Sequence, residues 1–376
     1  MGVNKYLKKE IGSEFDISID FLLDIFQSKK LSPNKIFYKN VTDIAYLSNG
    51  RTAIKFILSH IMKKKRINKC WLPSYLCETI IQPFRELKLD YEFYNLEENL
   101  QIDIDYLSKR LEKNDLLFAS NYFNLSHDNI VIEFLKKLKN NNIVVIDDLT
   151  HSFLNNNVFS FKISDYSIIS LRKWLGISDG GIAISNDALF DKKLIITKPF
   201  NDFVRLRLKY ALLKNFYLHE IINKEDSFRK MHDKAEEIAN LTIRLHEMSN
   251  ISKTILNTVN FSKIIYKRRM NFKYLLSSFE DLDKFKILSN NLEEGICPIG
   301  FPIITTKRDI LRDYLASNNI YCPIHWLLPK EIPKKFDYSY FLSQNIITIP
   351  CDQRYSIEDM EIIIRSVKRF YKKINS

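Results

Sequence analysis

Residues 167–185, which read SIISLRKWLGISDGGIAIS, hold the most informative pattern in the chain. An apolar strand runs directly into Lys173, and a tryptophan and a glycine turn follow. A lysine in such a place is expected to be partly desolvated, which lowers the pKa of its amine and makes it nucleophilic. The alternative is an ordinary surface lysine, but glycine is scarce and concentrated here. Of the eight glycines in 376 residues, three lie within six residues in this stretch: Gly176, Gly180 and Gly181.

Short apolar stretches typical of strands lie before this segment and alternate with amphipathic helices. One such helix is predicted over residues 51–66, where apolar side chains recur at helical spacing. Strands and helices in this alternation predict an α/β fold with a mainly parallel sheet flanked by helices on both faces. The predicted strands lie at residues 70–72, 91–94, 116–119, 143–146 and 166–171. Ligands bind at the carboxyl ends of the strands in such sheets, so the loops there are the candidates for chemistry.

Residues 48–52 (SNGRT) form one such loop, directly before the predicted helix. The start of a helix presents free N–H groups and the positive end of the helix dipole, which together suit a phosphate group. An ordinary helix cap, with Gly50 making the turn, explains the same residues equally well.

Residues 144–151 (VVIDDLTH) run from a buried strand into two carboxylates and an imidazole. Neighbouring residues on a strand point to opposite faces, so only one of Asp147 and Asp148 can face a site. The alternative is a helix cap beside a solvated aspartate, and the position at the end of a parallel strand favours the functional interpretation. For residues 73–77 (PSYLC), a plain β-to-α loop with a proline turn remains open.

The composition, 45% hydrophobic and 27% charged, is that of a soluble globular protein. With so few glycines, neither a dinucleotide fingerprint nor a P-loop can be assembled. The net charge of +12 attracts anions, and phosphorylated small molecules are among them. The densest basic runs, at residues 63–66 and 368–373, fall near predicted helix ends. Solvated helix ends are therefore favoured over a nucleic-acid surface, and no nucleic-acid partner is expected.

A chain of 376 residues is long enough for two cooperating domains. We predict a large domain over residues 1–245, with a helical insertion at about 190–245, and a smaller C-terminal α/β domain over residues 246–376. In the insertion, Phe203, Tyr210 and Tyr217 recur at helical spacing among basic residues. This pattern favours a helix that packs on its own protein over one that lies on a membrane surface.

Two further features bear on location. No run approaches the roughly 20 apolar residues that a membrane span requires. The five cysteines form no C-x-x-C pair, and the start of the chain lacks a signal-peptide pattern. These features favour a cytoplasmic protein with free thiols.

Taken in order, these segments resemble the motifs of the DegT/StrS-type (DegT/DnrJ/StrS) aminotransferases. That family belongs to the fold type I pyridoxal phosphate (PLP) enzymes, which have a large sheet domain and a small C-terminal domain. It is best known for aminating nucleotide-linked keto sugars. The resemblance spans roughly residues 45–370, and the matching stretches read SNGRTAI, LPSYLCETI, VVIDDLTHSF, ISLRKWLG, SDGGIAISND, NNIYCPIHW and ITIPCDQRYSIEDM.

The resemblance implies PLP as cofactor and gives individual residues roles toward it. Lys173 would bind the cofactor covalently and move a proton between substrate and cofactor. Asp148 would pair with the pyridine nitrogen, and His151 would contact the ring near its hydroxyl group.

The resemblance also implies a phosphate site. The backbone N–H groups of Gly50, Arg51 and Thr52 would hold the phosphate, and Ser170 would add a hydroxyl. The family usually has four residues between this serine and the lysine, whereas this chain has two, which affects the assignment of Ser170 more than that of Lys173.

Cys77 stands where the family commonly has an aromatic residue stacked on the cofactor ring. A thiol fills the space but cannot stack, and Tyr75 is a candidate replacement. His325 and Trp326 are candidates for substrate contact, with plain packing as the alternative. No metal ligand is expected.

The function implied by the resemblance is transfer of an amino group from an amino acid such as glutamate to a nucleotide-linked or phosphorylated keto sugar, as in surface-polysaccharide or related sugar biosynthesis. It also implies a homodimer. One alternative is a related PLP enzyme without transaminase activity, such as a sugar dehydratase, although those relatives replace the lysine by histidine and Lys173 is present here. A second alternative is a non-catalytic member that binds a partner.

Overall fold

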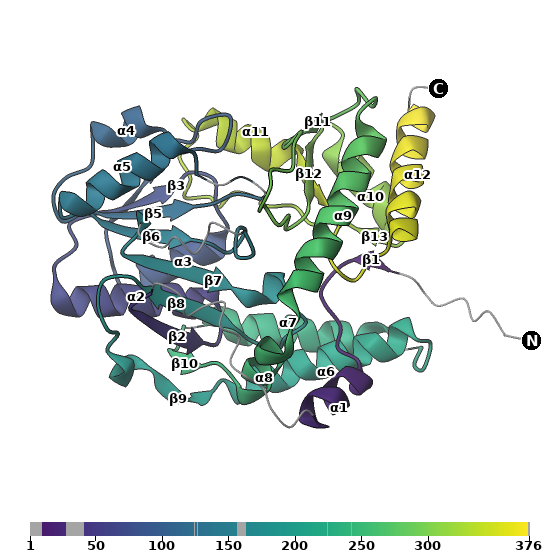
Figure 1. Cartoon of the computed structure of the whole chain (residues 1–376), viewed down its shortest axis with the longest axis horizontal. Helices are drawn as coiled ribbons and strands as arrows, with labels where there is room; N and C mark the ends of the chain where they lie inside the picture. Colours follow the sequence, from purple (N-terminus) through teal and green to yellow (C-terminus); the bar gives the residue numbers. More distant parts are fainter. Residues whose placement is uncertain are drawn as a thin grey trace, which may run out of the picture.

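A nine-stranded sheet forms the larger part of the molecule (Figure 1). The computed structural model describes residues 10–27, 41–123, 125, 127–155, 163–223, 225–241 and 243–374. The strand order is β4-β3-β5-β6-β7-β8-β2-β10-β9. The strands from β4 to β7 in this order pair in parallel, and β8 is antiparallel to both of its neighbours. The strands are β2 (Asp43–Leu47), β3 (Cys70–Pro73), β4 (Tyr91–Tyr94), β5 (Leu116–Ser120), β6 (Val144–Asp148), β7 (Tyr166–Ser170), β8 (Gly181–Ser185), β9 (Ile196–Pro199) and β10 (His246–Glu247).

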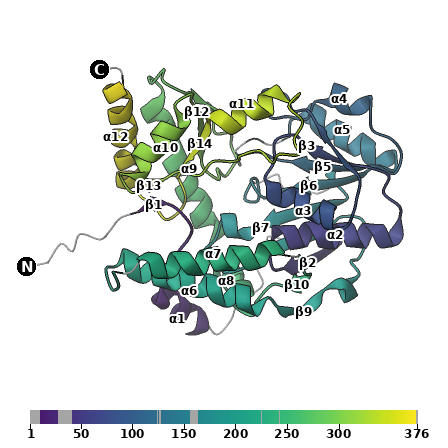
Figure 2. The same cartoon turned by 180° about the vertical axis from the view of Figure 1, so that it is seen from behind.

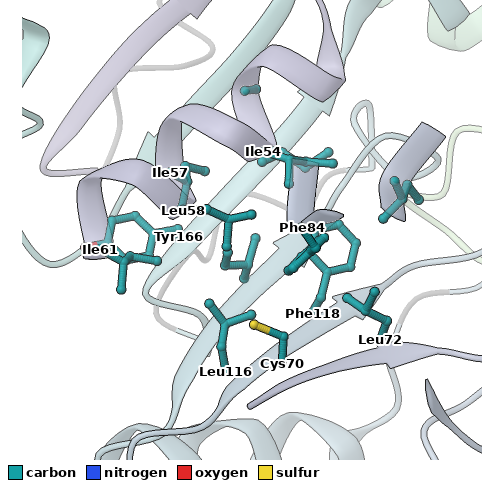
Figure 3. Close-up of a cluster of buried hydrophobic side chains, with 14 of the residues drawn as sticks. Ile54, Ile57, Leu58, Ile61, Cys70, Leu72, Phe84, Leu116, Phe118 and Tyr166 are labelled. Carbon is teal, nitrogen blue, oxygen red and sulfur yellow. The ribbon is translucent and has the colours of Figure 1, made fainter. Parts of the chain in front are cut away.

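Helices cover both faces of the sheet. On one face, α2 (Gly50–Lys64) and α3 (Glu78–Glu86) pack their apolar sides on the strands. Figure 3 shows Ile54, Ile57, Leu58 and Ile61 of α2 pointing toward the sheet. On the other face lie α4 (Ile104–Ser108), α5 (Asn129–Asn140) and α8 (Asn250–Thr258). The predicted fold, a mainly parallel sheet flanked by helices, is thus confirmed.

A second, smaller α/β unit follows in the chain (Figure 1). Its three-stranded antiparallel sheet has the order β11-β12-β14, and α9, α10 and α12 pack with it around a core of their own. The helix α9 contributes Phe261 and Ile264 to the core of the large sheet, and Phe272 and Phe279 to the core of the small unit. The elements are α9 (Phe261–Phe279), β11 (Lys286–Ile287), β12 (Phe301–Ile304), α10 (Arg308–Ala316), β13 (Ile320–Tyr321), α11 (Asp337–Asn345), β14 (Ile346–Ile349) and α12 (Ile357–Ile374).

The predicted boundary between residues 245 and 246 stays a prediction. After that point, β10 still belongs to the large sheet, and α8 packs in the core of that sheet.

The helical insertion is a pair of helices, α6 (Asn201–Leu218) and α7 (Glu225–Leu241), which lie side by side at the lower edge of the molecule (Figures 1 and 2). Phe203, Tyr210 and Tyr217 of α6 are buried, as expected for a helix that packs on its own protein. The same helix buries two cations, Arg207 and Lys214. Among the described residues, no helix has the length and apolar character to span a membrane.

The segment 10–17 supplies partners for both buried cations. Glu14 accepts a 2.6 Å hydrogen bond from Arg207, and Ser13 Oγ accepts a 2.6 Å bond from Lys214. The strand β1 (Ile11–Gly12) pairs with β13 of the small unit, and the short helix α1 (Ile19–Gln27) follows the segment. The N-terminal segment therefore joins the helical pair to the small unit.

Candidate active site

A cavity of about 740 Å³ lies at the carboxyl ends of the parallel strands. The loop after β3, the ends of β5, β6 and β7 and the first turn of α2 line the cavity, as do residues of the small unit. The site residues predicted at the strand ends, apart from Thr52, all line this cavity, as do both predicted substrate contacts. They are Gly50, Arg51, Cys77, Asp148, His151, Ser170, Lys173, His325 and Trp326.

Lys173 ends the short 3-10 turn Leu171–Lys173 that follows β7, so its amine enters the cavity from the end of a strand. Its Nζ lies 3.1 Å from Nε2 of His151 and 5.1 Å from the ring centroid of Trp326. Burial lowers the pKa of the Lys173 amine, against the opposing charge of Asp148. The sequence-based expectation of a partly desolvated lysine thus agrees with its surroundings.

His151 is almost completely buried and packs parallel to Trp326, with ring centroids 5.1 Å apart and an angle of 24° between the rings. Burial, together with the charge of Lys173, holds the pKa of His151 well below its ordinary value, so the ring is neutral. Its Nδ1 accepts a hydrogen bond from the backbone N–H of Phe123 at 3.2 Å. The proton of the neutral ring therefore sits on Nε2, the nitrogen that lies 3.1 Å from the amine of Lys173.

The side chains of the two aspartates at the end of β6 point to opposite faces of the sheet, as strand geometry requires. Asp148 lines the cavity and accepts a 2.9 Å hydrogen bond from the backbone N–H of Thr150. Burial raises the pKa of Asp148. Asp147 points the other way, where Asn121 donates to it at 2.9 Å and Nε2 of His127 lies at 3.4 Å. Asp148 is thus the one that faces the cavity.

The first turn of α2 packs closely against the ends of β7 and β8. A Cβ atom on Gly50 would lie 3.2 Å from Cβ of Ser170, and one on Gly181 would lie 2.1 Å from the backbone oxygen of Asn49. Only glycine at position 181 permits this approach, which brings the start of α2 and Ser170 to the same wall of the cavity.

Asn49 and Thr52 form the cap of this helix. The side chain of Asn49 accepts the backbone N–H of Thr52 at 3.0 Å, and the Thr52 hydroxyl contacts Ser48. Thr52 is buried and does not line the cavity, unlike Gly50 and Arg51. Both interpretations of the SNGRT loop therefore describe part of it: a helix cap at Asn49 and Thr52, and a helix start open to the cavity at Gly50 and Arg51.

The side chain of Arg51 leads away from the loop to α7. It donates to Asn240 and lies 4.0 Å from Glu236 Oε2, while the other oxygen of Glu236 accepts from Arg172 at 2.8 Å and from Arg207 at 3.4 Å. One carboxylate on the helical insertion is thus shared by three guanidinium groups. We name Arg51, Arg172, Arg207 and Glu236 the arginine cluster.

Cys77 is half-buried at the start of α3, with its sulfur 3.2 Å from the hydroxyl of Thr79. Tyr75, its candidate replacement as a stacking residue, is completely buried against Trp326, and its hydroxyl donates to the backbone oxygen of His325. The aromatic ring parallel to His151 in this cavity is that of Trp326.

His325 contributes a second neutral imidazole to the cavity. Burial lowers the pKa of His325 to about 3, and its Nδ1 lies 2.9 Å from the hydroxyl of Thr348.

Sequence reasoning missed the arginine cluster and the position of Trp326 over Lys173. Glu236 lies more than sixty residues after Lys173 on a helix with no local motif, so nothing in the pattern points to it. Within the described part of the chain, no group of three His, Cys, Asp or Glu side chains could hold a metal ion.

Comparison with known proteins supports this picture at the level of the fold. No protein-family profile and no curated protein matches the sequence. Solved structures do match. The chain is similar to a putative sugar aminotransferase of Streptococcus pneumoniae in its PMP form, with a TM-score of 0.68 and 14% identity over 97% of this chain and 98% of that one.

Two further solved structures are similar along most of their length. Helicobacter pylori PseC, an aminotransferase involved in pseudoaminic acid biosynthesis, matches with a TM-score of 0.67 at 14% identity. The match covers 97% of this chain and 100% of the PseC chain. A DegT/DnrJ/EryC1/StrS aminotransferase of Brucella abortus gives 0.62 at 15% identity, over 89% of this chain and 87% of its own. The chain therefore has the fold of these sugar aminotransferases, and the resemblance inferred from its motifs is confirmed at the level of the fold.

Proposed function

We propose that this protein is a PLP-dependent aminotransferase. The observation that carries the proposal is the convergence of three groups at the strand ends of this fold: a half-buried lysine amine, a neutral histidine 3.1 Å from it, and a cavity-facing aspartate. The lowered pKa of Lys173 leaves its amine better able to attack a carbonyl carbon.

The residues present fit the cofactor. Gly50 and Ser170 pack closely and both line the cavity at the start of α2, where helix geometry leaves the first N–H groups without intrahelical acceptors and so suits a phosphate. Trp326 and His151 stack on one another beside Lys173 and form an aromatic part of the cavity wall. When bound, PLP supplies an electron-withdrawing ring that stabilises negative charge on a neighbouring carbon.

Each residue then has a definite task. The amine of Lys173 holds the cofactor and accepts or returns a proton. Asp148 lines the cavity and would pair with the ring nitrogen, since a carboxylate about 4 Å from a positive charge stabilises it by about 4 kcal/mol at an effective dielectric of 20. His151 donates from Nε2 and so orients polar groups next to the lysine. His325 and Trp326 line the wall that the small unit contributes and would contact the substrate.

We further propose that the amino acceptor is a nucleotide-linked or phosphorylated keto sugar and the donor an amino acid such as glutamate, as in surface-polysaccharide or related sugar biosynthesis. The net charge of +12 and the basic side chains of the cavity support an anionic acceptor. The names of the similar solved structures support the same class. A homodimer and a cytoplasmic location complete the proposal.

The test uses the purified full-length chain. Incubation with PLP, reduction with borohydride and peptide mass spectrometry are expected to leave a pyridoxyl phosphate group on Lys173. Incubation with glutamate and a panel of nucleotide-linked keto sugars is then expected to yield an amino sugar. No modification of Lys173 at saturating PLP would overturn the proposed function, and modification without amino sugar would overturn the substrate class.

A further inference from the structure

Arg172 has no role in the proposed function, yet it lies between Ser170 and Lys173 and lines the same cavity. Its Nη2 donates to Glu236, and 16% of its side chain remains accessible. Among the residues that the structure describes, Nη1 of Arg172 has no acceptor. The guanidinium is thus held at one arm, while the other arm is available to a ligand.

The position of this group matches the place proposed for the phosphate. The chain turns directly from Ser170 through Leu171 to Arg172, and Ser170 packs against Gly50 at the start of α2. Arg51 belongs to the same first turn of α2, and its Nη2 lies 4.0 Å from Oε2 of Glu236. Arg51 and Arg172 thus both line the cavity, and Glu236 on α7 lies beside both of their guanidinium groups.

Positively charged groups crowd this wall of the cavity. Three guanidinium groups face the carboxylates of Glu236 and Glu14, and the charge of Asp179 also acts on Arg172. Of the three, Arg51 and Arg172 line the cavity. The positive charge of Arg172 contributes to lowering the pKa of Arg51 after burial itself, so the two guanidiniums repel one another. A phosphate monoester, close to a dianion at neutral pH, relieves this repulsion and matches the planar donors of arginine.

We propose that Arg172 binds the phosphate of the cofactor through Nη1, and that Glu236 on α7 is the positioning residue that holds its guanidinium for this contact. The inference rests on the proposed function and extends it by a side-chain contact in addition to the N–H groups of α2. The proposed contact also gives a role to the short spacing between Ser170 and Lys173, because this spacing places Arg172 beside the proposed phosphate site. The helical insertion takes part through Glu236.

The test compares three ligands: PLP, pyridoxal, which has the same aldehyde but no phosphate, and inorganic phosphate, which needs no aldehyde chemistry. Dissociation constants are measured for the wild type, Arg172→Gln and Arg172→Lys. Arg205→Gln is the control for the loss of one positive charge, because Arg205 lies on α6 with 67% of its side chain exposed and pairs with Asp202 in the same turn.

Arg172→Gln is expected to weaken PLP and inorganic phosphate by about tenfold to a hundredfold, the range for one hydrogen bond between charged groups, and to leave pyridoxal within about twofold. Arg172→Lys is expected to retain part of the preference for PLP over pyridoxal. Arg205→Gln is expected to match the wild type. Equal losses of affinity for PLP and pyridoxal, or no loss of affinity for either ligand, would overturn the proposed contact between Arg172 and the cofactor phosphate. The second result is also the one expected if Arg172 binds the phosphate of a substrate instead.

The double variant Arg172→Gln/Glu236→Gln guards against misfolding, because it removes one charge of each sign and retains polar groups of similar shape. It is expected to fold, as shown by its circular dichroism, and to lose the phosphate preference as Arg172→Gln does. Retained preference would contradict the proposal. Inorganic phosphate separates the two hypotheses: if wild type binds it through Arg172 but never attaches PLP to Lys173, the proposed function fails and the phosphate contact stands.

Discussion

Replacing Glu236 by alanine is the most demanding test of the arginine cluster as a structural element. The carboxylate of Glu236 lies 2.8 Å from Arg172, 3.4 Å from Arg207 and 4.0 Å from Arg51. At an effective dielectric of 20, unit charges at such separations attract by about 4–6 kcal/mol per pair. Desolvation of the charges offsets much of this attraction.

The net effect follows from what the variant leaves behind. Glu236→Ala removes the carboxylate beside Arg51 and Arg172, while Arg207 keeps Glu14, and removing one member of a buried charge network costs about 3–5 kcal/mol. The side chain of Glu236 is 30% exposed, so water reaches part of the network and the lower end applies. We expect the free energy of unfolding to fall by about 3 kcal/mol.

The assay is urea denaturation of the wild type, Glu236→Ala and Glu237→Ala. Glu237 is the next residue of α7 and is exposed, so the control makes the same chemical change outside the cluster. We expect the control to stay within about 0.5 kcal/mol of the wild type. If Glu236→Ala is no less stable than Glu237→Ala, the attribution of stability to the cluster is refuted.

The pH dependence gives a second check on the same variant. Burial raises the pKa of Glu236, but the charges of Arg172 and Arg207 outweigh it and hold the pKa below the ordinary value of 4.5. A carboxyl group with a lowered pKa stabilises the fold above that ordinary value, and the contribution is lost as the pH falls. The stability difference between wild type and Glu236→Ala should therefore be full at neutral pH and shrink in acid. A difference that does not change would contradict the ionic origin.

Three further predictions concern other parts of the molecule. Burial lowers the pKa of Lys214 to about 8, so between this pH and about 10.5 only the unfolded chain keeps the proton. The stability of the wild type relative to Lys214→Met should therefore rise by about 3 kcal/mol over this pH range in urea titrations. A stability difference that does not change with pH would contradict this prediction. Gly181→Ala should lower the free energy of unfolding by about 1–3 kcal/mol and weaken PLP binding, because its Cβ would meet the Asn49 backbone at 2.1 Å; wild-type values in both titrations would refute this. Trp326→Leu should admit water to Lys173 and raise the pKa of its amine, so the pH profile for attachment of PLP should move to higher pH, and an unmoved profile would argue against burial by Trp326.

Much of the sheet could be predicted because its strands are short apolar runs separated by amphipathic helices. The strand predicted at residues 143–146 is β6 (Val144–Asp148), and the helix predicted at residues 51–66 is α2. Lys173, Asp148 and His151 follow strand ends, and parallel strands bring their carboxyl ends together, so topology alone places these three side chains in one cavity.

The remainder depends on contacts that no local pattern carries. The stripe on α6 correctly marked Phe203 and Tyr210 as buried, but Arg207 is buried too, because Glu14 from a distant segment neutralises it. Thr52 fits a phosphate motif by sequence, whereas its backbone N–H is taken by the neighbouring cap residue. The burial of Arg207 thus depends on a partner 193 residues away, whereas the cap at Thr52 is local and competes with a phosphate for the same N–H group.

The N-terminal segment has a consequence for the order in which the protein is completed during synthesis. Gly12 donates its backbone N–H to the hydroxyl of Tyr355, 343 residues later in the chain, and Arg354 donates to the backbone oxygens of Ser13 and Glu14. At about 5–20 residues per second, a ribosome needs roughly 20–70 seconds to span that distance. The segment that closes one wall of the cavity is thus translated long before its last partners, and its docking can be completed only after Tyr355 has been made. A nascent chain interrupted before Tyr355 would have its sheet and Lys173 but an unfinished cavity.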